Sequence, residues 1–226
     1  MDGGILGTNA NKKMENTLFL MLLTKQNIAN MERVERLKMI NSICGIRGVH
    51  LIGTKSPDNI TNLAIFSSVV HLGSNPSLLG FVSRPSEKVK RDTIANIMST
   101  NYYTINSIHE GILDKAHKTS GKYLSSISEF DKCGFNHQYI NNFYAPFIES
   151  SSIKIGMKFL QSIPIKHNNT CFVIGEIELI KCQYEILDEN FKDGVGVIGL
   201  NSYYKSRKIK DIEYFRVNNN DTSTNN

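Results

Sequence analysis

Short runs of apolar and β-branched residues, separated by glycine, asparagine, proline and serine, fill most of the chain after Gly48. Such runs, bounded by turn-forming residues, are typical of β-strands. They cover residues 49–52, 63–72, 78–82, 102–108, 153–155 and 171–180. Because few helical segments interrupt them, the pattern favours a barrel or sandwich over a doubly wound parallel sheet. We therefore predict a mainly β fold with peripheral helices.

Helical patterns occur in only three places. Residues 31–43 place apolar residues among charged ones at close to helical spacing, which predicts a short amphipathic helix. Asp92 and Thr93 can cap a second helix that ends near Ser99. Residues 113–130 form a third region, irregular or helical. These helices are expected to lie around the β structure.

The length of 226 residues suits one large domain or two small ones. No linker, repeat or abrupt shift in composition divides the chain, which favours one. We assign residues 1–30 to a flexible leader and N-terminal extension, and residues 31–217 to the domain. The wholly polar residues 218–226 are expected to be a disordered tail.

Charge and cysteine usage exclude several classes of function. The net charge of +5 is spread thinly, which argues against a nucleic-acid partner but allows an anionic small molecule such as a nucleotide. The longest apolar run near the start, residues 18–23, is far shorter than the roughly 18–20 residues of a membrane helix. Four widely spaced cysteines predict free thiols in a reducing cytoplasm and no metal site: Cys44, Cys133, Cys171 and Cys182.

Two nucleotide-binding motifs are present only superficially. Residues 194–199 read G-x-G-x-x-G, but too little chain follows for the helix, strand and acidic residue of a dinucleotide site. Residues 119–122 end like a phosphate-binding loop, yet position 116 is alanine and Tyr123 replaces the hydroxyl residue. Neither motif is expected to bind a nucleotide.

A cofactor pocket is suggested by residues 61–81, where small hydroxyl residues, an amide and an alanine share a predicted strand and its end. Small side chains let a flat ring approach the backbone, whose N–H groups can bond ring oxygens and nitrogens. Downstream, Arg84 and Arg91 precede the helix that begins at Asp92. A helix N-terminus beside basic groups attracts phosphate. An ordinary edge strand and a solvated basic loop remain the alternatives.

An ordered series of motifs resembles the flavin reductase-like family over about residues 37–205. The motifs are Thr61-Asn62-Leu63-Ala64-x-Phe66-Ser67-Ser68, Ser74-Asn75-Pro76-x-Leu78-x-Gly80-Phe81, Arg84-Pro85, Arg91-Asp92-Thr93-x-x-Asn96-Ile97, Tyr103-Thr104-Ile105-Asn106, Ala116-His117-x-Thr119-Ser120, Ser128-Glu129-Phe130, Ala145-Pro146-Phe147 and Gly175-Glu176-Ile177. The chain departs from the family at Ile65 and Ser77, where its members often carry proline. These departures leave the local loop geometry open.

The resemblance implies an FMN-binding split β-barrel, usually a homodimer with each flavin near the subunit interface. It also implies two-electron transfer between NADH or NADPH and a flavin, with FAD as the alternative to FMN. The implied flavin-binding residues are Asn62, Leu63, Ala64, Ser67, Ser68, Ser83, Arg84, Arg91 and His117. His117 and His71 have structural roles as their alternatives, and no residue is assigned as catalytic.

Three functions share such a pocket. The first is an NAD(P)H-dependent flavin reductase. The second is the reductase component of a two-component monooxygenase, which hands reduced flavin to an acceptor protein. The third is a non-enzymatic FMN-binding electron carrier of the flavoredoxin type. The sequence does not distinguish them, because hydride transfer between stacked rings needs positioning more than reactive side chains.

Overall fold

The computed structural model describes residues 21–85, 91–182, 194–205 and 207–215. The predicted C-terminal tail and residues 1–20 of the predicted leader lie outside these ranges. The helices are α1 (Lys25–Asn30), α2 (Arg33–Ser42), α3 (Asp92–Thr100), the 3-10 helix η1 (Glu110–Ile112), α4 (Leu113–Lys118) and α5 (Glu129–Cys133). The strands are β1 (Arg47–Gly48), β2 (His50–Lys55), β3 (Thr61–Phe66), β4 (Val70–Ser74), β5 (Ser77–Ser83), β6 (Tyr102–Ser107), β7 (His137–Gln138), β8 (Phe147–Ile148), β9 (Ile153–Ile165), β10 (Thr170–Cys182), β11 (Val195–Ile198) and β12 (Ser202–Lys205).

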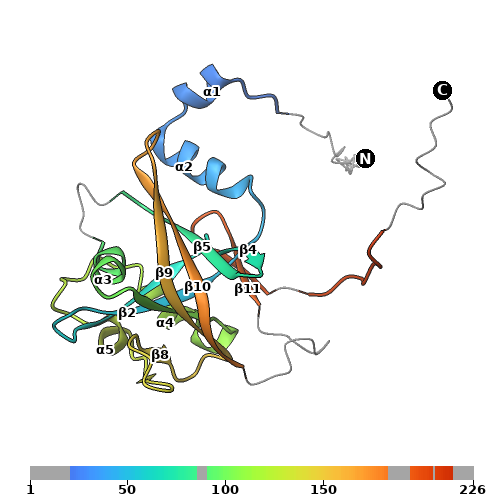
Figure 1. Cartoon of the computed structure of the whole chain (residues 1–226). Helices are drawn as coiled ribbons and strands as arrows, with labels where there is room; N and C mark the ends of the chain where they lie inside the picture. Colours follow the sequence, from blue (N-terminus) through green and yellow to red (C-terminus); the bar gives the residue numbers. More distant parts are fainter. Residues whose placement is uncertain (1–20, 86–90, 183–193, 206, 216–226) are drawn as a thin grey trace, which may run out of the picture.

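A seven-stranded antiparallel sheet dominates the molecule, with strand order β3-β2-β6-β9-β10-β5-β4. β9 and β10 cross the molecule as one long hairpin (Figure 1). A small sheet of order β1-β11-β12 and the β7-β8 pair complete the strands. The prediction of a mainly β fold with peripheral helices is confirmed. In the described part of the chain no helix is both long and apolar enough to cross a membrane.

The sheet curls until its two ends meet. Phe66 at the end of β3 packs edge-on against Phe81 of β5, with ring centroids 5.0 Å apart, although β3 begins the strand order and β5 is the last strand but one. Just beyond β3, the Ser68 hydroxyl accepts the backbone N–H of Val82 and donates to its carbonyl, both at 3.1 Å. These contacts close the sheet into a barrel.

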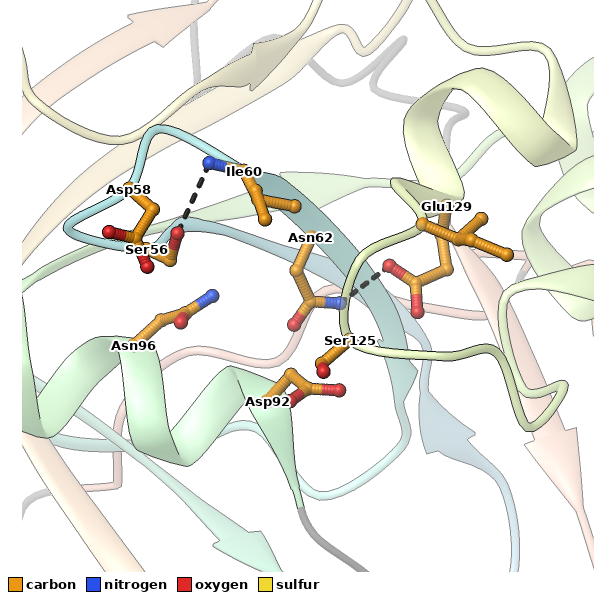
Figure 2. Close-up of a pocket in the computed structure, with 9 residues that line it drawn as sticks. Ser56, Asp58, Ile60, Asn62, Asp92, Asn96, Ser125 and Glu129 are labelled. Atoms are coloured by element: carbon orange, nitrogen blue, oxygen red, sulfur yellow. Dashed lines mark hydrogen bonds between the residues drawn. The ribbon is translucent and has the colours of Figure 1, made fainter.

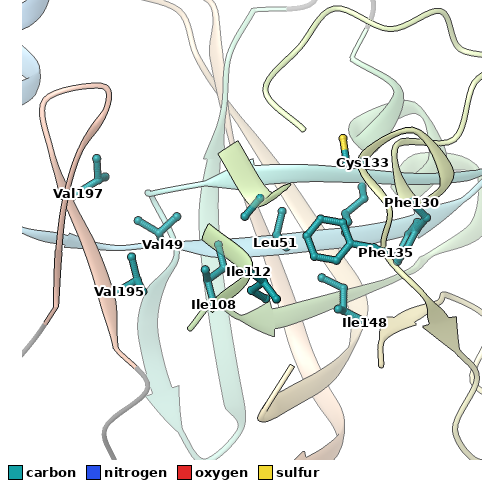
Figure 3. Close-up of a cluster of buried hydrophobic side chains, with 12 residues drawn as sticks. Val49, Leu51, Ile108, Ile112, Phe130, Cys133, Phe135, Ile148, Val195 and Val197 are labelled. Atoms are coloured by element: carbon teal, nitrogen blue, oxygen red, sulfur yellow. The ribbon is translucent and has the colours of Figure 1, made fainter. Parts of the chain in front are cut away.

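The core lies on both faces of this sheet, and β2 shows why. Along β2, Leu51 faces one hydrophobic cluster and Ile52 faces the other, as the alternation of a strand requires. The cluster around Ile52 includes Phe81, Tyr103 and Ile97, the last of which belongs to α3. The cluster around Leu51 draws on α5 through Phe130 and on the small sheet through β11 (Figure 3).

Several local predictions can be compared with the structure. The helix predicted at 31–43 is confirmed as α2, whereas α1 was not predicted. The apolar run 63–72 is two strands, β3 and β4, joined by a turn. The prediction that Asp92 caps α3 is wrong, because Arg91 holds the N-cap position and makes no side-chain capping bond. Of the G-x-G-x-x-G segment, Gly194 directly precedes β11, Gly196 lies in it and Gly199 lies in the turn after it, so the rejection of a dinucleotide site agrees with the fold.

Acid should destabilise the fold through His50. Its Nδ1 atom is buried with no hydrogen-bond partner among the described residues, and burial lowers the pKa of His50 to about 4. Between pH 6.5 and pH 4 the unfolded chain therefore binds a proton that the folded chain does not. We expect the free energy of unfolding to fall by about 2 kcal/mol from this group between pH 7.5 and pH 5. Denaturant unfolding at both pH values should show a smaller fall for His50→Gln, and an equal fall would contradict this assignment.

Candidate functional site

Strand β3 is the edge strand around which the sequence-predicted flavin residues gather. It pairs with β2 on one side only. Helix α3 contacts β3, and so do α4 and α5. The side chains of β3 alternate between the two faces, so Leu63 enters one core cluster while Phe66 packs against the other. The candidate site is therefore an edge strand flanked by short helices.

A buried hydrogen-bond network fixes the N-terminus of α3 against β3. The side-chain oxygen of Asn62 accepts a hydrogen bond from the Thr93 hydroxyl at 3.1 Å and one from the Thr54 hydroxyl at 3.4 Å. Asn96 donates to the Thr54 hydroxyl at 3.0 Å. All four of these side chains are buried. Thr93 and Asn96 lie three residues apart, so they share one face of α3 and reach the strand together.

Two residues at the start of α5 hold the outer edge of β3. Glu129 is buried and accepts hydrogen bonds from the Asn62 side chain at 2.7 Å and from the Leu63 backbone N–H at 3.1 Å. The Ser128 and Thr61 hydroxyls lie 2.6 Å apart. The carboxylate thus supplies, for the Leu63 N–H, the hydrogen-bond acceptor that a neighbouring strand would otherwise provide at this edge. This arrangement fixes the position of the strand that precedes Ala64.

A small polar pocket of about 130 Å³ lies beside this network. Figure 2 shows Asn62, Asn96 and Ser125 around it, together with three carboxylates: Asp58, Asp92 and Glu129. Carboxylates repel phosphate, so the pocket does not suit a phosphate group. Within the described residues, no group of three or more His, Cys, Asp or Glu side chains is arranged to hold a metal ion.

The predicted flavin residues in β3 and directly after it differ in how accessible their side chains are to a ligand. Asn62 and Leu63 are buried and already have internal partners, so any contact from them to a ligand would come from the main chain. Ala64 and Ser67 are half-buried. Ser68 is half-buried as well, and its hydroxyl is bonded to the backbone of β5. Ala64 and Ser67 are thus small, half-buried side chains that leave part of their surface open to a ligand.

The arginines lie beyond β5 and at the start of α3. Ser83 is buried at the end of β5, and its hydroxyl bonds the carbonyl of the exposed Arg84 at 3.3 Å. Arg91 is partly buried and donates from Nε to the Pro85 carbonyl at 3.3 Å. Burial, and after it the positive charge of Arg84, lowers the pKa of Arg91. The charge of Arg84 thus reaches Arg91, which holds the N-cap position of α3.

His117 stands apart from the arginines. It lies in the last turn of α4, whose Ala116 packs into the core cluster that contains Leu63, not into the cluster that receives α3. Its ring is exposed, and its Nδ1 lies 2.8 Å from the hydroxyl of Tyr203 in β12. The structure therefore places His117 near β3 but on the opposite side of it from Arg91.

Four residues that hold the site together are not among the predicted flavin residues: Glu129, Thr93, Asn96 and Tyr203. For Thr93 and Asn96 a signal was present, since their spacing puts them on one face of the predicted helix. Glu129 followed a serine at the start of a helical region, which marks a helix N-terminus but not the strand that it contacts. For Tyr203, 86 residues from His117, no local pattern carried a signal.

Comparison with known proteins agrees with this architecture. A crystal structure of a protein assigned as a flavin reductase with a split barrel domain, from Shewanella frigidimarina, is 36% identical, with a TM-score of 0.81, and covers 86% of this chain and 100% of that one. Nitrilotriacetate monooxygenase component B from Bacillus cereus is 16% identical with a TM-score of 0.76, covering 86% of this chain and 100% of that one. Flavoredoxin of Desulfovibrio vulgaris is 17% identical with a TM-score of 0.63, covering 75% and 91%.

The sequence also matches a protein-family model described as the flavin reductase like domain. The match spans residues 45–210, which is most of the chain and includes β3, α3 and α4. The split barrel of the Shewanella protein and the curled antiparallel sheet described above are the same fold. The chain belongs to the flavin reductase-like family.

Proposed function

We propose that this protein binds FMN along the edge of β3 and reduces it with NADH or NADPH. The observation that carries the proposal is Arg91 at the N-cap of α3, with the charge of Arg84 near enough to lower its pKa. The Thr93–Asn62 hydrogen bond holds this end of α3 against β3. Arg91 lies two residues before Thr93, so this bond draws Arg91 and the N-terminus of α3, which also carries Asp92, to the strand that carries Ala64. A phosphate and a flat ring system would find complementary partners there.

The residues present fit such a cofactor. Arg91 and Arg84 would neutralise the phosphate, and the first backbone N–H groups of the nine-residue α3 would add hydrogen bonds. Ala64 and Ser67 leave room for the ring to approach the backbone at the end of β3. When bound, FMN supplies the two-electron chemistry. The chain itself needs only to bind both rings, orient them and exclude water.

The relatives support two versions of this function. The Shewanella relative is similar enough in sequence to favour a flavin reductase. The fold is also shared with a monooxygenase component and with flavoredoxin, so delivery of reduced flavin to a partner enzyme and electron carriage are the second candidates.

A homodimer belongs to the proposal as well. β4 is an exposed edge strand whose Val70 and Leu72 are 45% and 43% exposed, a surface that a second copy would cover.

Anaerobic mixing separates these functions. Purified protein loaded with FMN is mixed with NADH or NADPH, and the flavin absorbance is followed. We expect rapid bleaching with at least one of the two nucleotides, as a reductase requires. Tight FMN that neither nucleotide reduces would instead favour the electron carrier. A protein with no affinity for flavin would exclude all three functions.

A further inference from the structure

His117 and Tyr203 form a hydrogen-bonded pair between α4 and β12. The Nδ1 atom of His117 lies 2.8 Å from the Tyr203 hydroxyl, and the two rings meet edge to face with centroids 5.7 Å apart. One ring nitrogen of His117 is therefore occupied within the protein. The other, Nε2, has no partner among the described residues, and the His117 side chain is exposed.

Tyr203 is the better-fixed member of the pair. Its ring packs against the core cluster that contains Val195 and Val197, and its backbone is paired with Val197 of β11. A second link, an exposed ion pair of 3.3 Å between Lys205 and Glu110, joins the same strand to the turn that precedes α4. The tyrosine is thus held by the fold, whereas the histidine ring is held mainly by the tyrosine.

The tyrosine supplies a donor for this hydrogen bond, and the role of His117 Nδ1 in it depends on the tautomer of the ring. Burial raises the pKa of Tyr203, so its hydroxyl keeps its proton at neutral pH. The hydroxyl can then donate to Nδ1 of a neutral imidazole, which accepts with that nitrogen and carries its own proton on Nε2. A ring fixed in this form presents an N–H donor to the solvent side.

We infer that Tyr203 is a positioning residue that fixes His117 as an Nε2–H donor, so that His117 binds a hydrogen-bond acceptor oxygen. This inference rests on the proposed function for the identity of the ligand, since such an oxygen is present in the phosphate and carbonyl groups of flavin and nicotinamide nucleotides.

The pair itself is tested by nitrogen-15 NMR of the His117 ring at neutral pH without ligand. In the wild-type protein we expect the Nε2–H form, with Nδ1 accepting a hydrogen bond. Tyr203→Phe should give a mixture of both neutral forms, while Tyr204→Phe, which changes the exposed neighbour on β12, should leave the signal unchanged. A wild-type ring protonated on Nδ1, or a signal that Tyr203→Phe does not move, would overturn the inference even if no flavin binds.

Ligand binding tests the consequence. Tyr203→Phe removes the bond that orients His117, so it should raise the dissociation constant or KM of the ligand that His117 binds by about 3- to 10-fold. In a protein that already carries His117→Ala, adding Tyr203→Phe should have no further effect. Weakening of FMN but not riboflavin would identify the flavin phosphate as the acceptor. Equal weakening of both flavins would identify a ring carbonyl, and a raised KM for NADH or NADPH alone would identify the nicotinamide nucleotide. If no ligand is affected, or if the loss persists without His117, the inference is wrong.

Discussion

Replacing Arg91 with alanine should weaken FMN binding by roughly 10- to 150-fold. This corresponds to about 1.5–3 kcal/mol, the value of one charge-assisted hydrogen bond to a phosphate. Arg91 is the N-cap residue of α3, and its charge is close enough to Arg84 for the two to affect each other. Isothermal titration of the protein with FMN measures the loss directly.

Riboflavin is the matched ligand for this experiment, because it carries the same ring system without the phosphate. Arg91→Ala should hardly change the affinity for riboflavin, and Arg91→Lys should recover part of the affinity for FMN. An equal loss for both ligands would show that Arg91 acts through folding or loop position, for example through its hydrogen bond to Pro85. If neither affinity changes, the phosphate binds elsewhere.

Replacing Glu129 with alanine should lower the free energy of unfolding by about 3–4 kcal/mol. The carboxylate accepts two buried hydrogen bonds, from the Asn62 side chain and the Leu63 backbone N–H. Hydrogen bonds to a charged group contribute about 1.5–3 kcal/mol each, and their loss leaves buried donors unpaired. Urea unfolding monitored by circular dichroism should therefore show a clearly lower midpoint.

Two further variants show whether the effect belongs to these contacts. Both bonds are accepted by the same oxygen of Glu129, so Glu129→Gln can keep them, loses only the charge, and should be destabilised by about half as much. Asp131→Ala, at an exposed position in the same helix, should change stability by less than about 0.5 kcal/mol. Similar losses for Glu129→Ala and Asp131→Ala would mean that α5 itself, and not its contact with β3, supplies the stability.

The strands and helices that form around local patterns were predictable from the sequence. β5, β6 and α3 carry their own periodicity and are bounded by turn residues, so their positions were predicted closely. β9 was not, since only residues 153–155 were assigned and the strand runs to Ile165. Beyond Met157 its residues are mostly exposed or half-buried, and pairing with β10 extends the strand where its own composition carries little signal.

Within the site, the sequence indicated which segments gather at β3 but not which way each side chain points. Asn62 is predicted to line the flavin; its side chain is engaged by Thr93 and Glu129, so such a contact would come from its main chain. Whether a strand residue faces a ligand or the interior depends on what covers each face, and distant segments decide that. The contact between His117 and Tyr203 depends in the same way on the pairing of β11 with β12.

A crystal structure of the protein with FMN bound tests the central claim most directly, because it locates the cofactor relative to β3 and α3. We predict that the phosphate lies within hydrogen-bonding distance of the Arg91 guanidinium and the first N–H groups of α3, with the ring against the backbone near Ala64 and Ser67. A phosphate bound away from both arginines, or a ring in the pocket lined by Asp58 and Ser125, would contradict the claim.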